Sequence, residues 1–190
     1  MIVEKAYLRE RAVAYAERWA LSRNPLFYDF AGTGGDCTNF VSQCILAGCC
    51  TMNFTPTYGW YFRSSADRAP SWTSVEYLYD FLTGSPEFVL ENGGIGPFGR
   101  EIARVAALPG DVVQLADDTG DYYHTLLITS LTPDDLLVSA HTNDALNRPL
   151  SSYNFAMARY IQIDGVRVSY PDDRCYWNLL NGESLPTEQI

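Results

Sequence analysis

The first fifty residues carry apolar side chains at helical spacing, which predicts two helices. One apolar stripe, flanked by charged positions, consists of Leu8, Ala12, Tyr15 and Trp19. This stripe predicts an amphipathic helix over residues 4–22. The helix should end before Pro25, because the residue that precedes a proline avoids the α region.

The second predicted helix follows a glycine-rich turn at residues 32–35. Asp36 is a favourable N-cap residue and Gly48 is a favourable residue for ending a helix, so the helix is expected to lie between them. Cys37 is then the first residue inside this helix.

Three further stretches complete the N-terminal half. Residues 51–70 mix aromatic and turn-forming side chains without a steady period, and predict an ordered loop. A third helix is predicted over residues 74–82, ending at Gly84. Residues 84–100 are rich in glycine and proline and are expected to form a mobile insert.

From residue 110 onward, apolar and polar positions alternate with a period of two, which is typical of strands. The predicted strands are residues 111–115, 122–129, 136–141, 158–163 and 166–169. Helices first and strands afterwards predict an α+β fold, in which N-terminal helices pack on an antiparallel sheet. The length of 190 residues predicts a single domain over residues 1–190.

The charge excludes some classes of partner. A formal net charge of −10, with only 13 Lys and Arg, argues against nucleic acid and against docking on anionic lipid. No apolar run approaches the roughly 18 residues of a membrane span. The first eleven residues are charged where a signal peptide would be apolar, so a cytoplasmic protein is expected. A cell-wall location would require another export route or a larger parent protein, and the sequence indicates no oligomeric state.

The five cysteines are odd in number, and four of them fall within residues 37–50. This pattern is untypical of a secreted disulfide framework, so reduced thiols are expected. The absence of a CxxC pair and the presence of only two histidines also predict that the chain binds no metal, and no cofactor is expected. Cys44, Cys49 and Cys50 are interpreted as structural residues.

Cys37 is the candidate nucleophile. The unpaired N–H groups and the positive end of the dipole at a helix start stabilise thiolate over thiol. The same N–H groups can hold the oxyanion of a tetrahedral intermediate. The alternative is that Cys37 is a small core residue, which is the commoner role of an arbitrary cysteine.

The two histidines, His124 and His141, are the candidate bases, and both lie on predicted strands. Alternation places His124 on the apolar face of its strand. A hairpin centred on residues 132–133 would make the two histidines cross-strand neighbours. Triad logic then assigns attack to Cys37, proton transfer to His124 and orientation of the imidazole to His141, with Asn143 as the alternative orienter.

Four segments carry a family likeness. Residues 35–43, Gly-Asp-Cys-Thr-Asn-Phe-Val-Ser-Gln, resemble the nucleophile signature of the putative amidase domain family, a branch of the papain-like superfamily that includes NlpC-type peptidases and CHAP amidases. Residues 108–114, 123–125 and 141–144 resemble its later blocks in the same order. The resemblance implies a papain-like fold and a triad of Cys37 and His124 with His141 or Asn143.

The activity that this resemblance implies is amide hydrolysis through an acyl-enzyme on Cys37, without a metal. The implied substrates are short peptides, including muropeptides derived from peptidoglycan. Asp36, Trp60 and Tyr122 are the candidate substrate-binding residues. An acyltransferase with the same triad, or a catalytically silent binding module of the same fold, are the alternatives.

Overall fold

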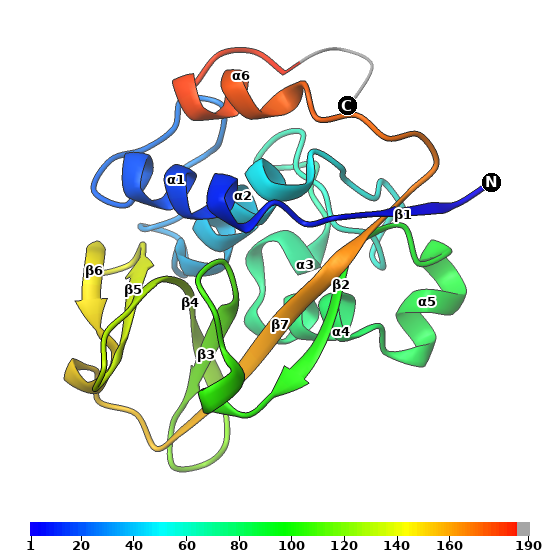
Figure 1. The fold of residues 1–190 in the computed structure, drawn as a ribbon. Helices are drawn as coiled ribbons and strands as arrows, with labels where there is room; N and C mark the ends of the chain where they lie inside the picture. Colours follow the sequence, from blue (N-terminus) through cyan, green and yellow to red (C-terminus); the bar gives the residue numbers. More distant parts are fainter. Residues whose placement is uncertain (186–190) are drawn as a thin grey trace.

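Seven strands form one open antiparallel sheet in the computed structural model, which describes residues 1–185 (Figure 1). The strands are β1 (Val3–Lys5), β2 (Gly96–Ile102), β3 (Val112–Ala116), β4 (Tyr122–Leu131), β5 (Leu136–Ala140), β6 (Ala145–Pro149) and β7 (Met157–Val168). Their order is β1-β7-β3-β4-β5-β6, and β2 also pairs with β7. The last five residues of the predicted domain lie outside the described part.

The described part of the chain also contains six α-helices. They are α1 (Arg9–Trp19), α2 (Cys37–Cys49), α3 (Pro70–Thr73), α4 (Val75–Thr83), α5 (Pro86–Asn92) and α6 (Cys175–Asn181), with short 3-10 turns η1 (Arg104–Ala106) and η2 (Leu150–Ser152). Figure 1 shows α1 and α2 close together, with α6 lying over them. The predicted α+β class, with N-terminal helices and an antiparallel sheet, is confirmed.

The two faces of the sheet belong to two different hydrophobic clusters. Leu127 of β4 joins the larger cluster, which also contains the apolar residues of α1 and α2. Leu126 and Ile128 join a smaller cluster on the other face, because successive side chains of a strand point to opposite sides. Every residue of α2 is buried, and the helix carries no charged side chain, although Thr38, Asn39, Ser42 and Gln43 are polar.

The end of α2 differs from the prediction. The helix continues through Gly48 to Cys49, and Cys50 takes the left-handed conformation that ends it, with φ of 48°. Gly48 has a different purpose, since a Cβ atom there would lie 2.4 Å from Cε2 of the Tyr7 ring. The glycine permits the close approach of Tyr7 to the helix.

The predicted mobile insert over residues 84–100 is wrong. This stretch forms α5 and most of β2, and β2 pairs with β7 over its whole length. Gly84 and Gly93 take positive φ angles directly after α4 and α5, so they end helices instead of loosening the chain. The two last predicted strands likewise form one strand, β7, in which a bulge leaves Asp164 without a partner in β2.

A disulfide between Cys50 and Cys175 contradicts the expected reduced thiols. It joins the end of α2 to the start of α6 across a separation of 125 residues. The crowding of cysteines near residue 50 concealed this pairing, because the partner is brought in only when α6 packs on α1 and α2. Within residues 1–185 no helix is long and apolar enough to cross a membrane.

The disulfide is predicted to stabilise the fold by about 4 kcal/mol, because it closes a long loop in the unfolded chain. Cys50→Ser should lower the free energy of unfolding by about that amount, measured by urea denaturation at pH 7. Dithiothreitol should destabilise the wild type equally and leave the Cys50→Ser, Cys175→Ser double variant unchanged. A wild type insensitive to the reductant would contradict this assignment.

Candidate active site

A pocket of about 290 Å³ lies where the start of α2 meets the start of β4 and the turn after β5. It is lined by Gly34, Gly35, Cys37, Tyr123, His124, Thr142, Asn143, Arg148 and Tyr153. The structure therefore brings together three of the residues predicted to be catalytic, Cys37, His124 and Asn143, although they come from three different segments.

Cys37 is the first residue of α2, as predicted, and its side chain is 7% exposed. Its Sγ atom lies 3.8 Å from Oγ1 of Thr38. Burial raises the pKa of the Cys37 thiol, and hydrogen bonds from the backbone of Thr125 and from Thr38 offset this only in part. The expected thiolate is therefore not the resting form, and the side chain rests as a neutral thiol.

A buried polar contact fixes the start of α2 on β4. The hydroxyls of Thr38 and Thr125 are 2.9 Å apart, and both side chains are buried. Gln114 on β3 lies beside them and donates through Nε2 to the carbonyl of Val75 at 2.8 Å. Because Thr125 faces α2, alternation along β4 turns His124 to the opposite face of the sheet.

His124 is a buried, neutral imidazole. Burial first, and then the positive charge of Arg148, lower its pKa from 6.5 to about 4. Its ring is parallel to the ring of Tyr123. The centroids of the His124 and Tyr153 rings lie 6.0 Å apart. Within residues 1–185, neither ring nitrogen of His124 has a hydrogen-bond partner, Cys37 included.

The predicted pairing of His124 with His141 is wrong by one residue. Leu127 faces Ser139 and Ile128 faces Val138, a register that would bring Thr142 opposite His124. A bulge between Ile128 and Ser130 changes the register of this hairpin. A slip of one residue sends a side chain to the other face of the sheet, and β5 ends at Ala140, before His141.

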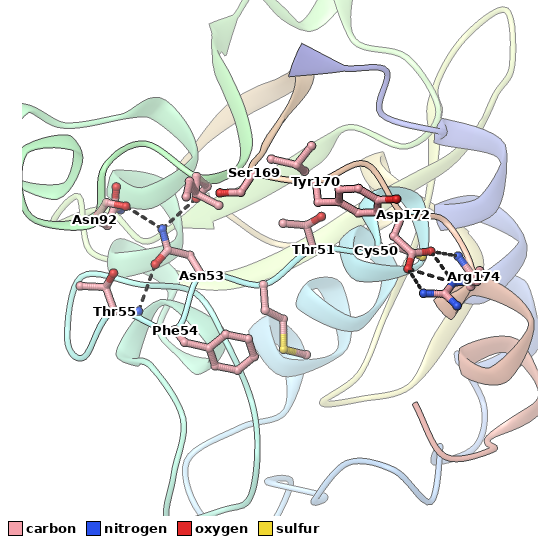
Figure 2. Close-up of a pocket in the computed structure, with 13 residues that line it drawn as sticks. Cys50, Thr51, Asn53, Phe54, Thr55, Asn92, Ser169, Tyr170, Asp172 and Arg174 are labelled. Carbon is pink, nitrogen blue, oxygen red and sulfur yellow. Dashed lines mark hydrogen bonds and ion pairs between the residues drawn. The ribbon is translucent and has the colours of Figure 1, made fainter. Parts of the chain in front are cut away.

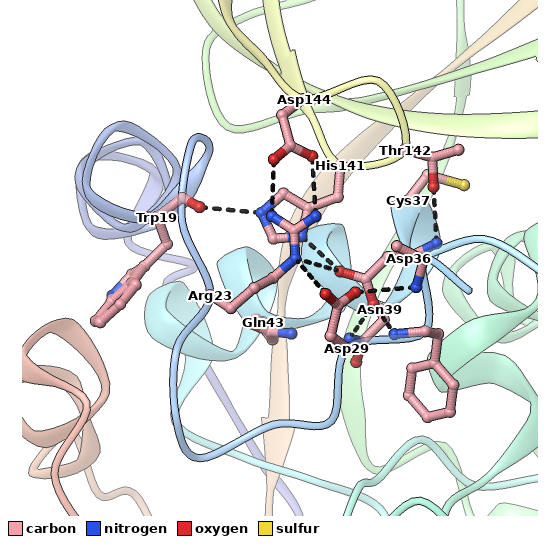
Figure 3. Close-up of polar contacts among 12 residues, drawn as sticks. Trp19, Arg23, Asp29, Asp36, Cys37, Asn39, Gln43, His141, Thr142 and Asp144 are labelled. Carbon is pink, nitrogen blue, oxygen red and sulfur yellow. Dashed lines mark hydrogen bonds and ion pairs between the residues drawn. The ribbon is translucent and has the colours of Figure 1, made fainter. Parts of the chain in front are cut away.

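His141 instead lies between α1 and the start of α2 (Figure 3). Its Nδ1 lies 2.5 Å from Oδ2 of Asp36, and its Nε2 lies 2.9 Å from the carbonyl oxygen of Trp19. The ring also stacks on Phe40, with centroids 4.1 Å apart. Both ring nitrogens are engaged by these contacts, so neither nitrogen of His141 is free to orient His124.

Asp36 occupies the N-cap position of α2, but its side chain does not cap the helix. Its Oδ1 accepts hydrogen bonds from the backbone of Phe30 and from Nδ2 of Asn39, while Oδ2 binds His141. Asp36 is fully buried and does not line the pocket, so the structure places it beneath the site. The predicted direct contact with substrate is not supported by this position.

Arg23 joins Asp36 to the turn after β5 (Figure 3). It forms a two-pronged ion pair with Asp144, at 2.9 and 3.0 Å, and its Nε lies 3.7 Å from Oδ2 of Asp36. Together with Asp29, these side chains make one ionic network under the pocket. The network connects the loop after α1, the start of α2 and the β5–β6 turn.

The β5–β6 turn is held in a strained conformation. Thr142 and Asn143 have φ angles of 61° and 63°. Asn tolerates this left-handed region, but a β-branched Thr rarely adopts it. The hydroxyl of Thr142 accepts the backbone N–H of Asp36 at 2.8 Å, which holds the turn against α2 and places Asn143 in the pocket.

The two aromatic candidates do not line the pocket. Trp60 is fully buried, donates to Oγ of Ser42 and packs on Trp72, so it belongs to the core. Tyr122 lies under the guanidinium of Arg159, whose Cζ atom is 3.8 Å from the centroid of the Tyr122 ring. The register shift opposite Tyr122, at the end of β3, breaks the alternation that had grouped it with His124.

Sequence reasoning missed three residues of the pocket wall, Tyr123, Arg148 and Tyr153. Arg148 and Tyr153 come from β6 and the segment after η2, neither of which was predicted. No local motif marks them, because they reach His124 only through the pairing of β6 with β5.

A larger cavity of about 500 Å³ lies beside the disulfide (Figure 2). Its lining includes Asn53, Asn92 and Tyr170, but no histidine, and its cysteine is the disulfide-bonded Cys50. Within residues 1–185 no three His, Cys, Asp or Glu side chains are grouped to hold a metal ion. The smaller pocket is therefore the candidate active site, because it holds both a free thiol and an imidazole.

Comparison with known proteins identifies the family of the chain. The sequence matches the family described as putative amidase domain over residues 6–163, which includes all of the predicted catalytic residues. It is also 32% identical over 151 residues to the uncharacterized protein YhbB of Bacillus subtilis (strain 168). That alignment covers 75% of this chain and only 43% of the relative. No solved structure matches, so the papain-like assignment stays a prediction.

The low pKa of His124 predicts a loss of stability in acid. Between pH 6.5 and about 4 the unfolded chain takes up a proton at this position and the folded chain does not. The contribution of neutral His124 to the free energy of unfolding is therefore fully present above pH 6.5 and is lost as the pH falls through about 4. The expected loss from this group is about 3 kcal/mol.

Urea denaturation of wild type and His124→Gln at pH 7 and pH 4 measures this contribution, because the variant lacks the titrating ring. The wild type should lose about 3 kcal/mol more than the variant between the two pH values. Equal losses would show that His124 keeps an ordinary pKa in the folded protein.

Proposed function

Because the chain belongs to the putative amidase domain family, we propose that it is a cysteine-dependent amide hydrolase with Cys37 as nucleophile and His124 as base. The observation that carries the proposal is that a thiol at a helix start and an unbonded imidazole line one pocket. The same arrangement of a cysteine at a helix start and a histidine on the sheet supports a papain-like relationship.

The reaction would begin from the neutral pair. A bound amide brings its carbonyl carbon to Sγ of Cys37, and His124 removes the thiol proton as the C–S bond forms. The backbone N–H groups of the first turn of α2 point toward the developing oxyanion. His124 then protonates the leaving amine, and water hydrolyses the thioester to release the acid.

The resting structure has no hydrogen bond between Cys37 and His124 within the described residues. In resting enzymes catalytic hydrogen bonds are often long and tighten only with substrate bound. The same observation favours a second candidate, a catalytically silent binding module that keeps the pocket and has lost turnover. Hydrolysis by the purified protein separates the two.

Asn143 is the better candidate for the orienting residue. It shares the pocket with His124, and its amide can accept or donate to a ring nitrogen. His141 has both nitrogens engaged by Asp36 and Trp19, and therefore acts in this proposal through Asp36, as a positioning residue.

Short peptides, among them muropeptides derived from peptidoglycan, suit a pocket of about 290 Å³. An acyltransferase would use the same residues and differ only in accepting an amine in place of water. The disulfide between Cys50 and Cys175 favours an oxidising compartment over the expected cytoplasm.

The proposal predicts graded losses of activity on a panel of muropeptides, measured by mass spectrometry of the cleaved amide. Cys37→Ala should abolish turnover, and His124→Ala should lower kcat by at least about a thousandfold. Asn143→Ala should lower kcat by roughly tenfold to a hundredfold, since the imidazole loses its orientation.

Cys44→Ala is the matched control, because Cys44 is a buried core thiol on the same helix. It should lose some stability and keep turnover. Full activity in Cys37→Ala would refute the nucleophile assignment. A wild type that binds the muropeptides without cleaving them, and without transferring their acyl group to added amines, would favour the silent module.

A further inference from the structure

The wall of the pocket beside His124 carries a cation that the proposed chemistry does not use. Arg148 of β6 is the one Lys or Arg among the residues that line the pocket, and no Asp or Glu lines it. Within residues 1–185 Arg148 forms no ion pair with a carboxylate. This uncompensated positive charge is unusual in a chain whose formal net charge is −10.

The guanidinium of Arg148 is held in a fixed orientation. Its Nε donates to Oγ of Ser152 at 2.8 Å, and its Nη2 donates to the carbonyl of the same residue at 2.9 Å. Its Cζ lies 4.0 Å from the centroid of the Tyr153 ring. Two of the five N–H donors are used in this way, so three remain for a ligand. A fixed guanidinium loses little entropy when it binds a planar anion.

Tyr153 adds a second donor to the same wall. Its hydroxyl oxygen is buried beside the side chain of Arg148. Burial raises the pKa of Tyr153, with Arg148 acting in the opposite direction, so the phenol stays protonated at neutral pH. Tyr153 lines the pocket together with Arg148, so a ligand that binds this guanidinium also lies beside the phenol.

We propose that Arg148 and Tyr153 form a carboxylate subsite, and that the substrate bears a free carboxylate next to the amide that Cys37 attacks. The carboxylate belongs to the amino-acid residue on one side of the scissile bond, either as its α-carboxylate or as an acidic side chain. This inference rests on the proposed function, since it assigns a substrate class to the same pocket.

A carboxylate in this subsite has a consequence for His124. The charge of Arg148 lowers the pKa of His124 in the resting protein. A bound anion cancels part of that charge, so the imidazole becomes a stronger base only when the correct substrate is present. The subsite therefore couples recognition of the carboxylate to activation of the thiol.

Two small alkylating reagents test the subsite directly at Cys37. Iodoacetate and iodoacetamide both transfer a two-carbon group to the sulfur and release iodide, and they differ in charge. The measured quantity is the ratio of the two rate constants at Cys37, followed by peptide mass spectrometry at pH 8. The reference is the same ratio for Cys37 in the urea-unfolded protein.

In the folded wild type, the rate constant for iodoacetate divided by that for iodoacetamide should exceed the reference ratio by about tenfold, as expected for a charge-assisted contact. Arg148→Gln should return the ratio to the reference, and Arg148→Lys should keep part of the preference. Tyr153→Phe removes only the hydroxyl and should lower the ratio by a smaller factor.

Arg100→Gln is the matched control, because it removes the same charge from an exposed position on β2 that does not line the pocket. Its ratio should equal that of the wild type. A wild-type ratio equal to the reference, or an Arg148→Gln ratio equal to the wild type, would overturn the subsite while leaving the nucleophile assignment intact. A Cys37 that neither reagent labels would overturn both proposals.

Discussion

The buried hydrogen bond between His141 and Asp36 is the contact on which the geometry of the candidate site depends. It joins the turn after β5 to the start of α2, while the second nitrogen of His141 binds the carbonyl of Trp19 at the end of α1. Three segments far apart in the sequence therefore meet at one imidazole. Because Cys37 directly follows Asp36, the position of the thiol relative to β4 is set through this contact.

A buried polar contact of this kind is weak evidence for stability, since desolvation of both groups offsets much of the attraction. Removal of one partner is costly, because it leaves the other buried group without a hydrogen-bond partner. The contact is therefore better understood as a positioning device. It holds Thr142 and Asn143 in their left-handed turn, and that turn carries Asn143 into the pocket with Cys37 and His124. Strain in the turn is balanced by the ionic network beneath it.

The sequence alone predicted the helices and strands with a clear period, and the placement of Cys37 at the first position of α2. It also placed His124 on the face that it occupies, because alternation along one strand is a local property. The pairing of His124 with His141 failed because the hairpin is centred between residues 133 and 134, where Leu131 faces Leu136. A bulge in β4 then shifts the register by one residue without restoring the predicted pairing, and no residue type signals that bulge. The disulfide and the position of Arg148 in the pocket wall were missed for a related reason, since both depend on long-range packing.

The most direct test of the account is to trap the acyl-enzyme. Wild type incubated with a cleaved muropeptide is quenched in acid, and the intact mass and the tryptic peptides are measured. The expected result is an added mass equal to the acyl part of the substrate, located on Cys37 and removed by hydroxylamine at neutral pH. Turnover of the same substrate with no adduct on Cys37, and with activity retained in Cys37→Ser, would contradict it.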